Sequence, residues 1–233
     1  MLEIRRLNAG YGRAQVLFDL DLEVGAGEVV ALLGRNGAGK STALKTAMGL
    51  LSPFTGKILF REKEIQGMQA QEIARLGLAY VPEDRRIFAD LSVVENLEAG
   101  RLPPRAGAPR WTLERLFELF PNLARMRERP GGSMSGGEQQ MLSIARSLMG
   151  NPSALLLDEP FEGLAPLIVD GIVKTVRELK REGLSVLLCE QNLRYARRVA
   201  DRVCIIEKGR LCHAGPMAGL DADPALFERF LAV

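Results

Sequence analysis

One short segment constrains the fold of this 233-residue chain more than any other, namely Gly34-Arg35-Asn36-Gly37-Ala38-Gly39-Lys40-Ser41. It matches G-x-x-x-x-G-K-[ST], a pattern in which a glycine-rich loop connects a strand to a helix. The flanking sequence agrees with this pattern. The apolar run Glu28–Leu33 is typical of a strand buried on both faces, and the segment from Gly39 to about Leu50 predicts a helix. The segment therefore predicts an α/β fold.

The chemistry of this segment, called here the phosphate loop, is anion binding. Its glycines let the backbone curl so that successive N–H groups point at phosphate oxygens, and the helix N-terminus adds positive potential. Lys40 is expected to reach the β- and γ-phosphates and to serve catalysis, while the Ser41 hydroxyl is expected to bind Mg²⁺. The candidate nucleotide-binding residues of this segment are Gly34, Arg35, Asn36, Gly37, Ala38, Gly39, Lys40, Ser41 and Thr42.

Two acidic residues follow a second apolar strand. Ala154–Leu157 reads as a buried parallel strand that delivers Asp158 and Glu159 to its carboxyl end, the edge at which α/β sheets bind ligands. By itself the pair would equally fit a strand that ends in solvated charges. Beside a phosphate loop, Asp158 is expected to bind Mg²⁺ and Glu159 to accept a proton from an attacking water. Strand alternation would point the side chains of Asp158 and Glu159 to opposite sides. Glu83 and Glu190 are the alternatives to Glu159 as the general base.

The third chemical signal is Met134-Ser135-Gly136-Gly137-Glu138-Gln139-Gln140. Ser135 and Glu138 form the capping-box pattern that starts a helix, and taken alone the segment would simply be a capped helix. Two glycines in the first turn are poor helix formers, so we expect something to approach the backbone closely there. A hydroxyl and bare N–H groups at a helix N-terminus would form a second anion site.

The remaining pattern predicts strands first, then helices, then an alternation of the two. Strands are expected at Gln15–Val24, Glu28–Leu33, Lys57–Phe60 and Leu78–Val81, with turns at Gly25–Gly27 and Ser52–Gly56. Helices are expected at Glu95–Arg101, Trp111–Phe120 and Ser135–Met149, with a loop at Leu102–Arg110. Further strands are expected at Ala154–Leu157, Leu184–Cys189, Arg202–Ile206 and Arg210–His213, and helices at Ala165–Glu182, Leu193–Ala200 and Pro224–Leu231. This alternation predicts a parallel sheet to which the antiparallel start and the central helices are additions.

Composition excludes several classes of protein. Hydrophobic residues make up 47% and charged residues 26%, which is ordinary for a globular chain. No apolar run approaches the ~18 residues of a membrane-spanning helix. Cys189, Cys204 and Cys212 are too scattered for a disulfide framework or a zinc site, which favours a reducing compartment. A net charge of +2 gives no reason to expect nucleic acid as the main partner.

The order of these motifs resembles the nucleotide-binding subunit of an ABC transporter over nearly the whole chain. The phosphate loop, the S-G-G-E sequence and the L-L-L-D-E sequence occur in that family's order. The resemblance implies an α/β P-loop NTPase core with a parallel sheet, an N-terminal antiparallel β-subdomain and an inserted helical subdomain. It implies one ABC ATPase domain over residues 1–233, with the helical subdomain at about 85–150, and ATP and Mg²⁺ as cofactors.

The resemblance also implies roles for residues outside the phosphate loop. Tyr11 matches the aromatic residue that stacks on adenine, although a surface aromatic in a turn would look the same. Val16 is placed like the apolar residue beside the ribose. In the family, two subunits sandwich ATP, which assigns the signature residues Ser135, Gly136 and Gly137 to the γ-phosphate bound by the partner subunit.

Three departures from the general family pattern indicate a subgroup. Glu83 stands where a glutamine usually senses Mg²⁺ and the transmembrane partner, so it is a candidate for both nucleotide and metal binding. Gln191 stands at the catalytic position of a switch histidine and brings no positive charge, so hydrolysis at its site is expected to be slower. The segments Val81–Glu83, Gly163–Pro166 and Glu190–Asn192 together resemble an ATPase subunit of branched-chain amino acid importers, or of the related importers of urea and short amides.

The implied function is ATP hydrolysis that energises import of a branched-chain amino acid or a related small polar solute. The expected partners are transmembrane permease subunits, a second similar ATPase subunit in a homo- or heterodimer and, indirectly, a periplasmic solute-binding protein. The expected location is peripheral, on the cytoplasmic face of the inner membrane. The alternative is a soluble, non-transport ABC ATPase acting on a nucleic-acid or ribosomal partner. Against it, the chain shows neither sustained heptads before the signature nor a second ATPase domain.

Two other P-loop classes fit the sequence less well. A GTPase would carry a guanine-reading N-K-x-D sequence, which this chain lacks, and a small-molecule kinase would leave the signature unexplained.

Arginines concentrate in the middle third, where they could face anionic lipid or the permease, or simply solvate a helical face. They are Arg85, Arg86, Arg101, Arg105, Arg110, Arg115, Arg125, Arg127 and Arg129.

Overall fold

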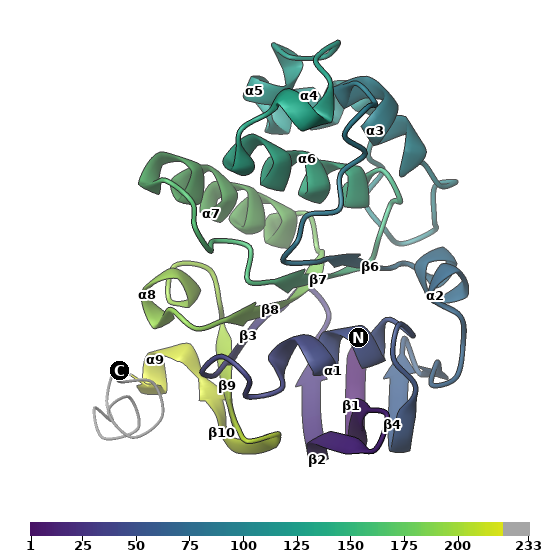
Figure 1. Ribbon diagram of the computed structural model, residues 1–233, viewed down its shortest axis with the longest axis vertical. Coiled ribbons are helices and arrows are strands. Elements are labelled where there is room, and N and C mark those ends of the chain that lie inside the picture. The colour runs from purple at the N-terminus through teal and green to yellow at the C-terminus, as the bar shows by residue number, and fades with distance from the viewer. Residues whose placement is uncertain (221–233) are drawn as a thin grey trace.

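Two β-sheets organise the chain, which the computed structural model describes over residues 1–220 (Figure 1). The antiparallel sheet has the order β2-β1-β4-β5 and consists of β1 (Leu2–Tyr11), β2 (Ala14–Val24), β4 (Pro53–Phe60) and β5 (Lys63–Glu64). The second sheet has the order β10-β9-β3-β8-β7-β6. Its strands are β3 (Val29–Leu33), β6 (Leu78–Val81), β7 (Ala154–Asp158), β8 (Ser185–Glu190), β9 (Arg202–Glu207) and β10 (Arg210–Pro216).

The second sheet is parallel except at its β10 edge. Strand β3 pairs in parallel with β8 and β9, and β7 pairs in parallel with β6 and β8, whereas β10 runs antiparallel to β9. Every residue of β3, β7 and β8 is buried, as expected for parallel strands covered on both faces. Successive residues enter different cores: Leu155 and Leu157 pack with the helices, and Leu156 packs with the antiparallel sheet.

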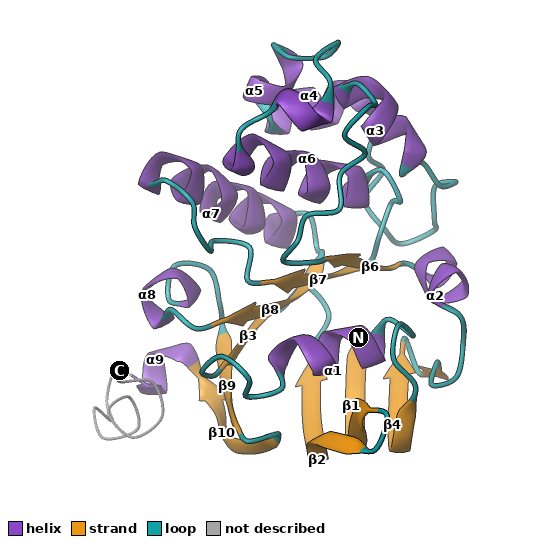
Figure 2. Ribbon diagram, viewed as in Figure 1, coloured by secondary structure: helices purple, strands orange, loops and turns teal. Residues whose placement is uncertain are grey.

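Helices cover both faces of the parallel sheet. They are α1 (Lys40–Ala47), α2 (Ala70–Leu76), α3 (Val93–Ala99), α4 (Leu113–Leu119), α5 (Pro121–Ala124), α6 (Gly136–Leu148), α7 (Pro166–Arg181), α8 (Leu193–Ala196) and α9 (Met217–Leu220), with a short 3₁₀ turn at Gly131–Ser133. Helix α1 lies between the two sheets, and α6 and α7 cover the opposite face (Figure 2). Helices α3 to α6 all fall within residues 85–150, and we propose this range as the helical subdomain.

The fold class expected from the sequence is confirmed, with differences in single elements. The long first strand β1 and helix α2 were not predicted, and α8 ends earlier than expected, at Ala196. Residues 53–56 of the turn expected at Ser52–Gly56 are instead part of β4. Gly56 adopts φ 104 beside an irregularity in the pairing of β1 with β4, where a Cβ would lie 2.5 Å from the Arg6 carbonyl oxygen. A glycine in a strand often marks such a bulge rather than a turn. The helix expected at Pro224–Leu231 lies outside the described residues.

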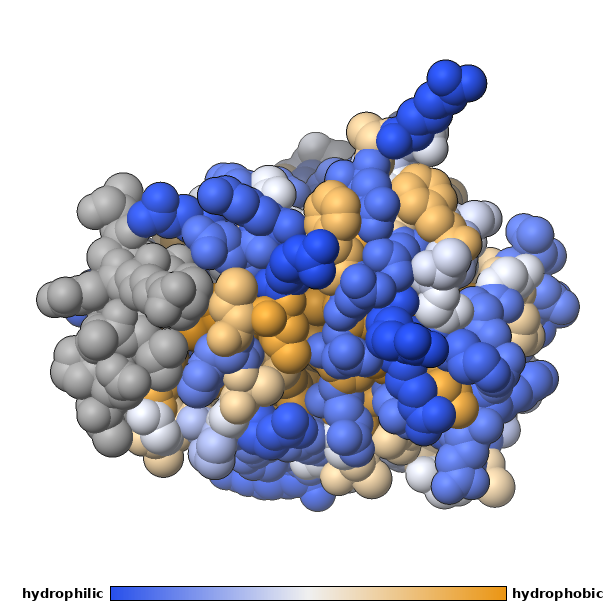
Figure 3. Space-filling view, turned by 90° about the horizontal axis from the view of Figure 1, so that it is seen from below, coloured by the Kyte–Doolittle hydropathy of each residue, from blue (hydrophilic) through white to orange (hydrophobic). Residues whose placement is uncertain are grey.

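None of the helices within residues 1–220 is long and apolar enough to cross a bilayer. Seen from the end that carries the antiparallel sheet, the surface is mostly hydrophilic, with smaller apolar areas between the polar side chains (Figure 3). Cys189 and Cys204 are buried and Cys212 is exposed, and all three are free thiols.

Several arginines of the middle third prove to be structural. Arg105 donates hydrogen bonds to backbone carbonyl oxygens of residues 74, 75, 150 and 151, which ties the loop after α3 to the end of α2 and to the turn before β7. Arg115 and Arg127 each lie 4.3 Å from the centre of an aromatic ring, those of Trp111 and Phe117. Arg105 therefore ties the helical subdomain to α2, and Arg115 and Arg127 pack within that subdomain rather than only solvating a helical face.

Candidate functional site

The phosphate loop runs from the end of β3 to the start of α1, as its pattern predicts. Gly37 and Gly39 have left-handed backbones, with φ 77 and φ 110. A Cβ at Gly39 would lie 2.8 Å from the Leu17 side chain, so glycine is required there both by conformation and by space. The turn places Lys40 at the first position of α1.

Lys40 points back into the loop and is almost fully buried. Its Nζ donates hydrogen bonds to the carbonyl oxygens of Gly34, at 2.8 Å, and Arg35, at 3.2 Å. The same Nζ lies 2.9 Å from Glu159 Oε1, and the two side chains are 3% and 6% exposed. A buried cation is therefore held at the mouth of a loop whose amides suit an anion.

The Asp158 carboxylate is anchored at both oxygens. Ser41 Oγ donates to Oδ1 and the Tyr80 hydroxyl donates to Oδ2, each at 2.9 Å. The pKa of Asp158 is raised, because burial outweighs the two hydrogen bonds, which lower it. Burial and the neighbouring Asp158 raise the pKa of the Tyr80 phenol, so Tyr80 keeps its proton and remains a donor.

Glu159 is aimed by a turn and not by strand alternation. Strand β7 ends at Asp158, and Glu159 has a left-handed backbone with φ 44. The expectation that the two carboxylates point to opposite sides is therefore wrong, because both reach the phosphate loop, Asp158 at Ser41 and Glu159 at Lys40. Left-handed non-glycine residues are strained and often cluster at functional sites.

The environment of Glu159 keeps it ionised. Gln191 Nε2 donates to Glu159 Oε2 at 2.6 Å. Burial acts to raise the pKa of Glu159, but the hydrogen bonds from Gln191 and Lys40 prevail and lower it. Glu162 shows the opposite shift, since its hydrogen bond with Glu159 and its partial burial raise its pKa. Glu159 is thus the carboxylate and Glu162 the more readily protonated acid of this pair.

These groups line a cavity of about 440 Å³. The lining residues are Tyr11, Val16, Asn36, Gly37, Gly39, Lys40, Ser41, Thr42, Glu83, Glu159 and Glu162. All but Glu162 were candidates from the sequence, whereas Gly34, Arg35 and Ala38 are not part of the lining. Gly34 packs against β9 instead, where a Cβ would lie 2.5 Å from the Ile206 carbonyl oxygen. Nothing in the sequence separates Glu162 from an ordinary turn residue.

The two alternative bases differ in their surroundings. Glu83 is exposed and lines the cavity. Glu190 is buried, and its carboxylate accepts hydrogen bonds from the backbone N–H groups of Phe161, Gln191 and Asn192, at 3.2–3.4 Å. Burial raises the pKa of Glu190 to about 7. Glu190 is therefore held by the backbone of the segments that follow β7 and β8, and it does not line the cavity.

The signature segment lies apart from the cavity, at the start of α6. Ser135 caps the helix, and Ser135 and Glu138 form the expected capping box. A Cβ at Gly136 would lie 2.7 Å from Arg85 Nη1, and one at Gly137 would lie 2.9 Å from Ile168 Cγ1. The groups that closely approach the backbone at these two glycines are thus the Arg85 and Ile168 side chains of the same chain.

The donors beside the phosphate loop fit Mg²⁺. Among the described residues, no group of three or more His, Cys, Asp or Glu side chains could hold a metal ion alone. Ser41 lines the cavity, and its hydroxyl is hydrogen-bonded to the buried Asp158 carboxylate behind it, so two hard oxygen ligands lie together at this wall. Mg²⁺ is usually held by one or two such protein ligands together with waters and substrate phosphates.

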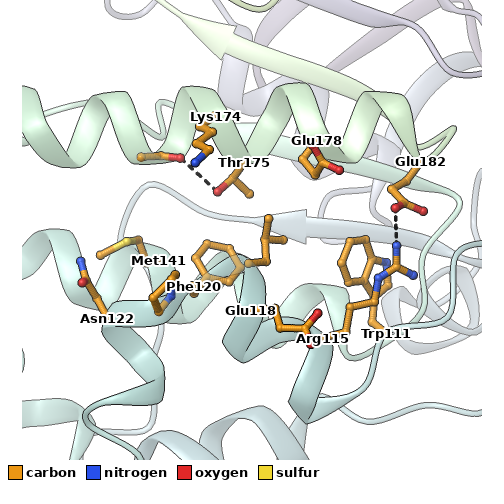
Figure 4. Close-up of a pocket in the computed structure, with 13 residues that line it drawn as sticks. Trp111, Arg115, Glu118, Phe120, Asn122, Met141, Lys174, Thr175, Glu178 and Glu182 are labelled. Carbon is orange, nitrogen blue, oxygen red and sulfur yellow. Dashed lines mark hydrogen bonds and ion pairs between the residues drawn. The ribbon is translucent and has the colours of Figure 1, made fainter.

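A second cavity, of about 500 Å³, lies between the helical subdomain and α7 (Figure 4). Arg115 pairs with Glu182 at one end of this cavity, and Trp111, Phe120 and Met141 supply apolar lining. It contains neither the phosphate loop nor the acids after β7, so the smaller cavity is the candidate active site.

Comparison with known proteins adds independent findings. A model of the ABC transporter family matches residues 17–162. The chain is 42% identical over 231 residues to the high-affinity branched-chain amino acid transport ATP-binding protein BraG of Pseudomonas aeruginosa, covering 99% of each. It is 35% identical over 235 residues to the lipopolysaccharide export system ATP-binding protein LptB of Acidithiobacillus ferridurans, covering 99% of this chain and 96% of that protein. The crystal structure of a nucleotide-free ATP-binding cassette from an ABC transporter matches with a TM-score of 0.83 at 25% identity, covering 98% of this chain and 97% of that one.

Proposed function

This chain belongs to the ABC transporter family of ATP-hydrolysing subunits, and we propose that it energises the import of a branched-chain amino acid or a related small polar solute. The observation that carries the ATPase chemistry is one cavity that joins the phosphate loop to Glu159. The assignment to import rests on the 42% identity to an amino acid transport subunit, against 35% to an export subunit.

ATP would lie with its adenine on Tyr11 and its phosphates in the phosphate loop. Tyr11 is 49% exposed at the cavity edge, so one face of its ring is free to stack. Lys40 would exchange its two loop carbonyls for phosphate oxygens. Ser41, Asp158 and Glu83 are the candidates to hold Mg²⁺, which when bound would neutralise phosphate charge.

Glu159 would act as the general base once the nucleotide enters. In the structure its carboxylate is shared between Lys40 and Gln191. If Lys40 bound phosphate oxygens instead of Glu159, one oxygen of the Glu159 carboxylate would be free to orient a water and accept its proton. Gln191 would continue to donate a hydrogen bond to the other oxygen. Glu162, in contact with Glu159, would buffer the charge of the pair.

A second ATPase subunit, identical or similar, would complete the site. The signature residues Ser135, Gly136 and Gly137 lie outside the cavity of their own chain, so within one subunit they cannot contact its nucleotide. Ile168 packs on Gly137, and its neighbour Leu167 is 80% exposed. An exposed apolar side chain next to the signature is therefore available to contact a second subunit. Facing subunits would bring each signature to the phosphates of the other.

The permease would dock on an apolar groove of about 350 Å³ between the helical subdomain and α1–α2. Leu50 and Phe88 line this groove and are 49% and 50% exposed, so together they present apolar surface of the kind that marks a protein-binding site. Docking there would place the subunit on the cytoplasmic face of the inner membrane, peripherally. A periplasmic solute-binding protein would act only through the permease.

The decisive experiment is purification from detergent-solubilised membranes followed by reconstitution. We expect permease subunits to co-purify, and the reconstituted complex to couple ATP hydrolysis to uptake of branched-chain amino acids. Lys40→Ala is expected to keep the complex but abolish hydrolysis and uptake. Export of a lipid or polysaccharide would overturn the import assignment, and recovery only of nucleic-acid or ribosomal partners would overturn the transport role.

A further inference from the structure

Tyr80 contacts the oxygen of the Asp158 carboxylate that the phosphate loop does not contact. Its hydroxyl donates to Oδ2 at 2.9 Å, while Ser41 Oγ donates to Oδ1 at 2.9 Å. Asp158 is 1% exposed, so solvent cannot replace either donor. The orientation of this carboxylate is therefore fixed by two hydroxyl groups, one on each oxygen.

Sheet register explains why Tyr80 can reach Asp158. Strands β6 and β7 are parallel neighbours, and Tyr80 stands opposite Leu156, two residues before Asp158. Residues two apart on a strand share a face, so a long phenol side chain on β6 extends along that face to the carboxylate. Register and side-chain length together bring this hydroxyl to the acid.

We propose that Tyr80 is a positioning residue for Mg²⁺ binding: its hydrogen bond holds Asp158 Oδ2 so that Oδ1 stays directed at the metal position beside Ser41. The proposal rests on the proposed function, because it requires Asp158 and Ser41 to hold the metal that accompanies the nucleotide. Without the hydroxyl, Oδ2 would be buried without this donor and the carboxylate could rotate. Groups that orient a metal ligand typically change metal affinity by 10–100-fold.

The test is Tyr80→Phe, which keeps the ring and removes only the donor. The affinity for a non-hydrolysable ATP analogue is measured by calorimetry in excess Mg²⁺ and in EDTA, and the ratio of the two gives the metal contribution. We expect this ratio to fall about 10-fold or more in Tyr80→Phe, with the EDTA value unchanged. Tyr195→Phe is the matched control, since Tyr195 packs on the Phe161 ring, whereas the side-chain donors to Asp158 are Ser41 and Tyr80. It should match wild type in both media.

Asp158→Asn separates failure of this inference from failure of the proposed metal site. If Asp158→Asn loses the Mg²⁺ contribution while Tyr80→Phe retains it, Tyr80 does not position the ligand. If Tyr80→Phe weakens binding equally in EDTA, its role is structural and the inference is also overturned. If Asp158→Asn keeps the full Mg²⁺ contribution, the proposed metal site itself is wrong. Thermal melting of each variant identifies loss of folding.

Discussion

At the scale of single residues, the most direct test of nucleotide orientation is Tyr11. We expect Tyr11→Ala to weaken ATP binding by up to about tenfold and Tyr11→Phe to leave it unchanged, because stacking uses the ring and is worth about 0.5–1.5 kcal/mol. Equilibrium titration with ATP measures both variants. Equal affinity in wild type and Tyr11→Ala would show that the ring, half exposed at the cavity edge, does not stack on the base.

The assignment of the general base can be tested on three glutamates at once. We expect Glu159→Gln to keep ATP affinity but lose about 10²–10⁴-fold in single-turnover hydrolysis, since an amide cannot accept the proton of the water. Glu83→Gln is the cavity-lining comparison and Glu190→Gln the buried one. Near wild-type turnover in Glu159→Gln, with loss in either of the others, would move the base to that residue.

Glu190 should make stability depend on pH. Burial raises its pKa from 4.5 to about 7 in the folded protein, so between these values the folded state binds more protons than the unfolded state. Its contribution to stability therefore falls as pH rises from about 5 to 7, by at most about 1.4 kcal/mol per pH unit. Melting temperatures should show this decline in wild type and not in Glu190→Gln. The exposed Glu118→Gln should behave as wild type; if Glu190→Gln does too, the buried acid is not the cause.

Which site residues could be predicted depends on how their geometry arises. Lys40 and Ser41 follow from a local pattern, because the loop alone sets their positions. Tyr80 and Glu162 could not be recognised, since one depends on the pairing of β6 with β7 and the other on a turn after β7. The direction of Glu159 was mispredicted for the same reason: a left-handed residue after the strand interrupts the alternation.

At the scale of elements, strands with strong apolar patterns were predictable and those with weak ones were not. Strands β3, β7 and β8 are buried on both faces and read as continuous apolar runs. Strand β1 contains Arg5 and Arg6 at exposed positions and a left-handed backbone at Arg6, so its pattern is broken at the irregularity in its pairing. Tertiary pairing with β2 and β4 forms this strand, and no local signal reveals it.

The start of α6 should act in a partner's site and not in its own. We expect Ser135→Arg to bind ATP as a monomer normally but to block ATP-driven dimerisation and hydrolysis, because a bulky cation there would obstruct a partner's nucleotide. Ser92→Arg is the matched control, since Ser92 caps α3 with the same capping box but lies outside the signature segment. Loss of the cap should lower the free energy of unfolding by a similar amount in both variants, about 1 kcal/mol. Light scattering with ATP and steady-state turnover separate them, and normal dimerisation of Ser135→Arg would remove the signature role.

At the scale of the whole molecule, two exposed apolar side chains stand on different surfaces and should serve different partners. Leu50 lines the groove beside the helical subdomain, and Leu167 lies beside the signature. We expect Leu50→Glu to abolish permease co-purification while ATP-driven dimerisation of the isolated subunit persists. Burying a charge in an apolar interface is unfavourable, because an apolar partner surface offers no opposite charge or hydrogen bond to compensate for lost water.

Leu167→Glu should show the reverse pattern, losing ATP-driven dimerisation while the permease still co-purifies. Leu50 is half exposed and Leu167 is largely exposed in the subunit, so neither substitution should lower its melting temperature appreciably. Affinity purification from membranes reports the permease contact, and light scattering with ATP and Glu159→Gln in the background reports the ATPase contact. If either variant lost both contacts, the two surfaces would be parts of one interface, and the arrangement of two ATPase subunits beneath a permease would have to be redrawn.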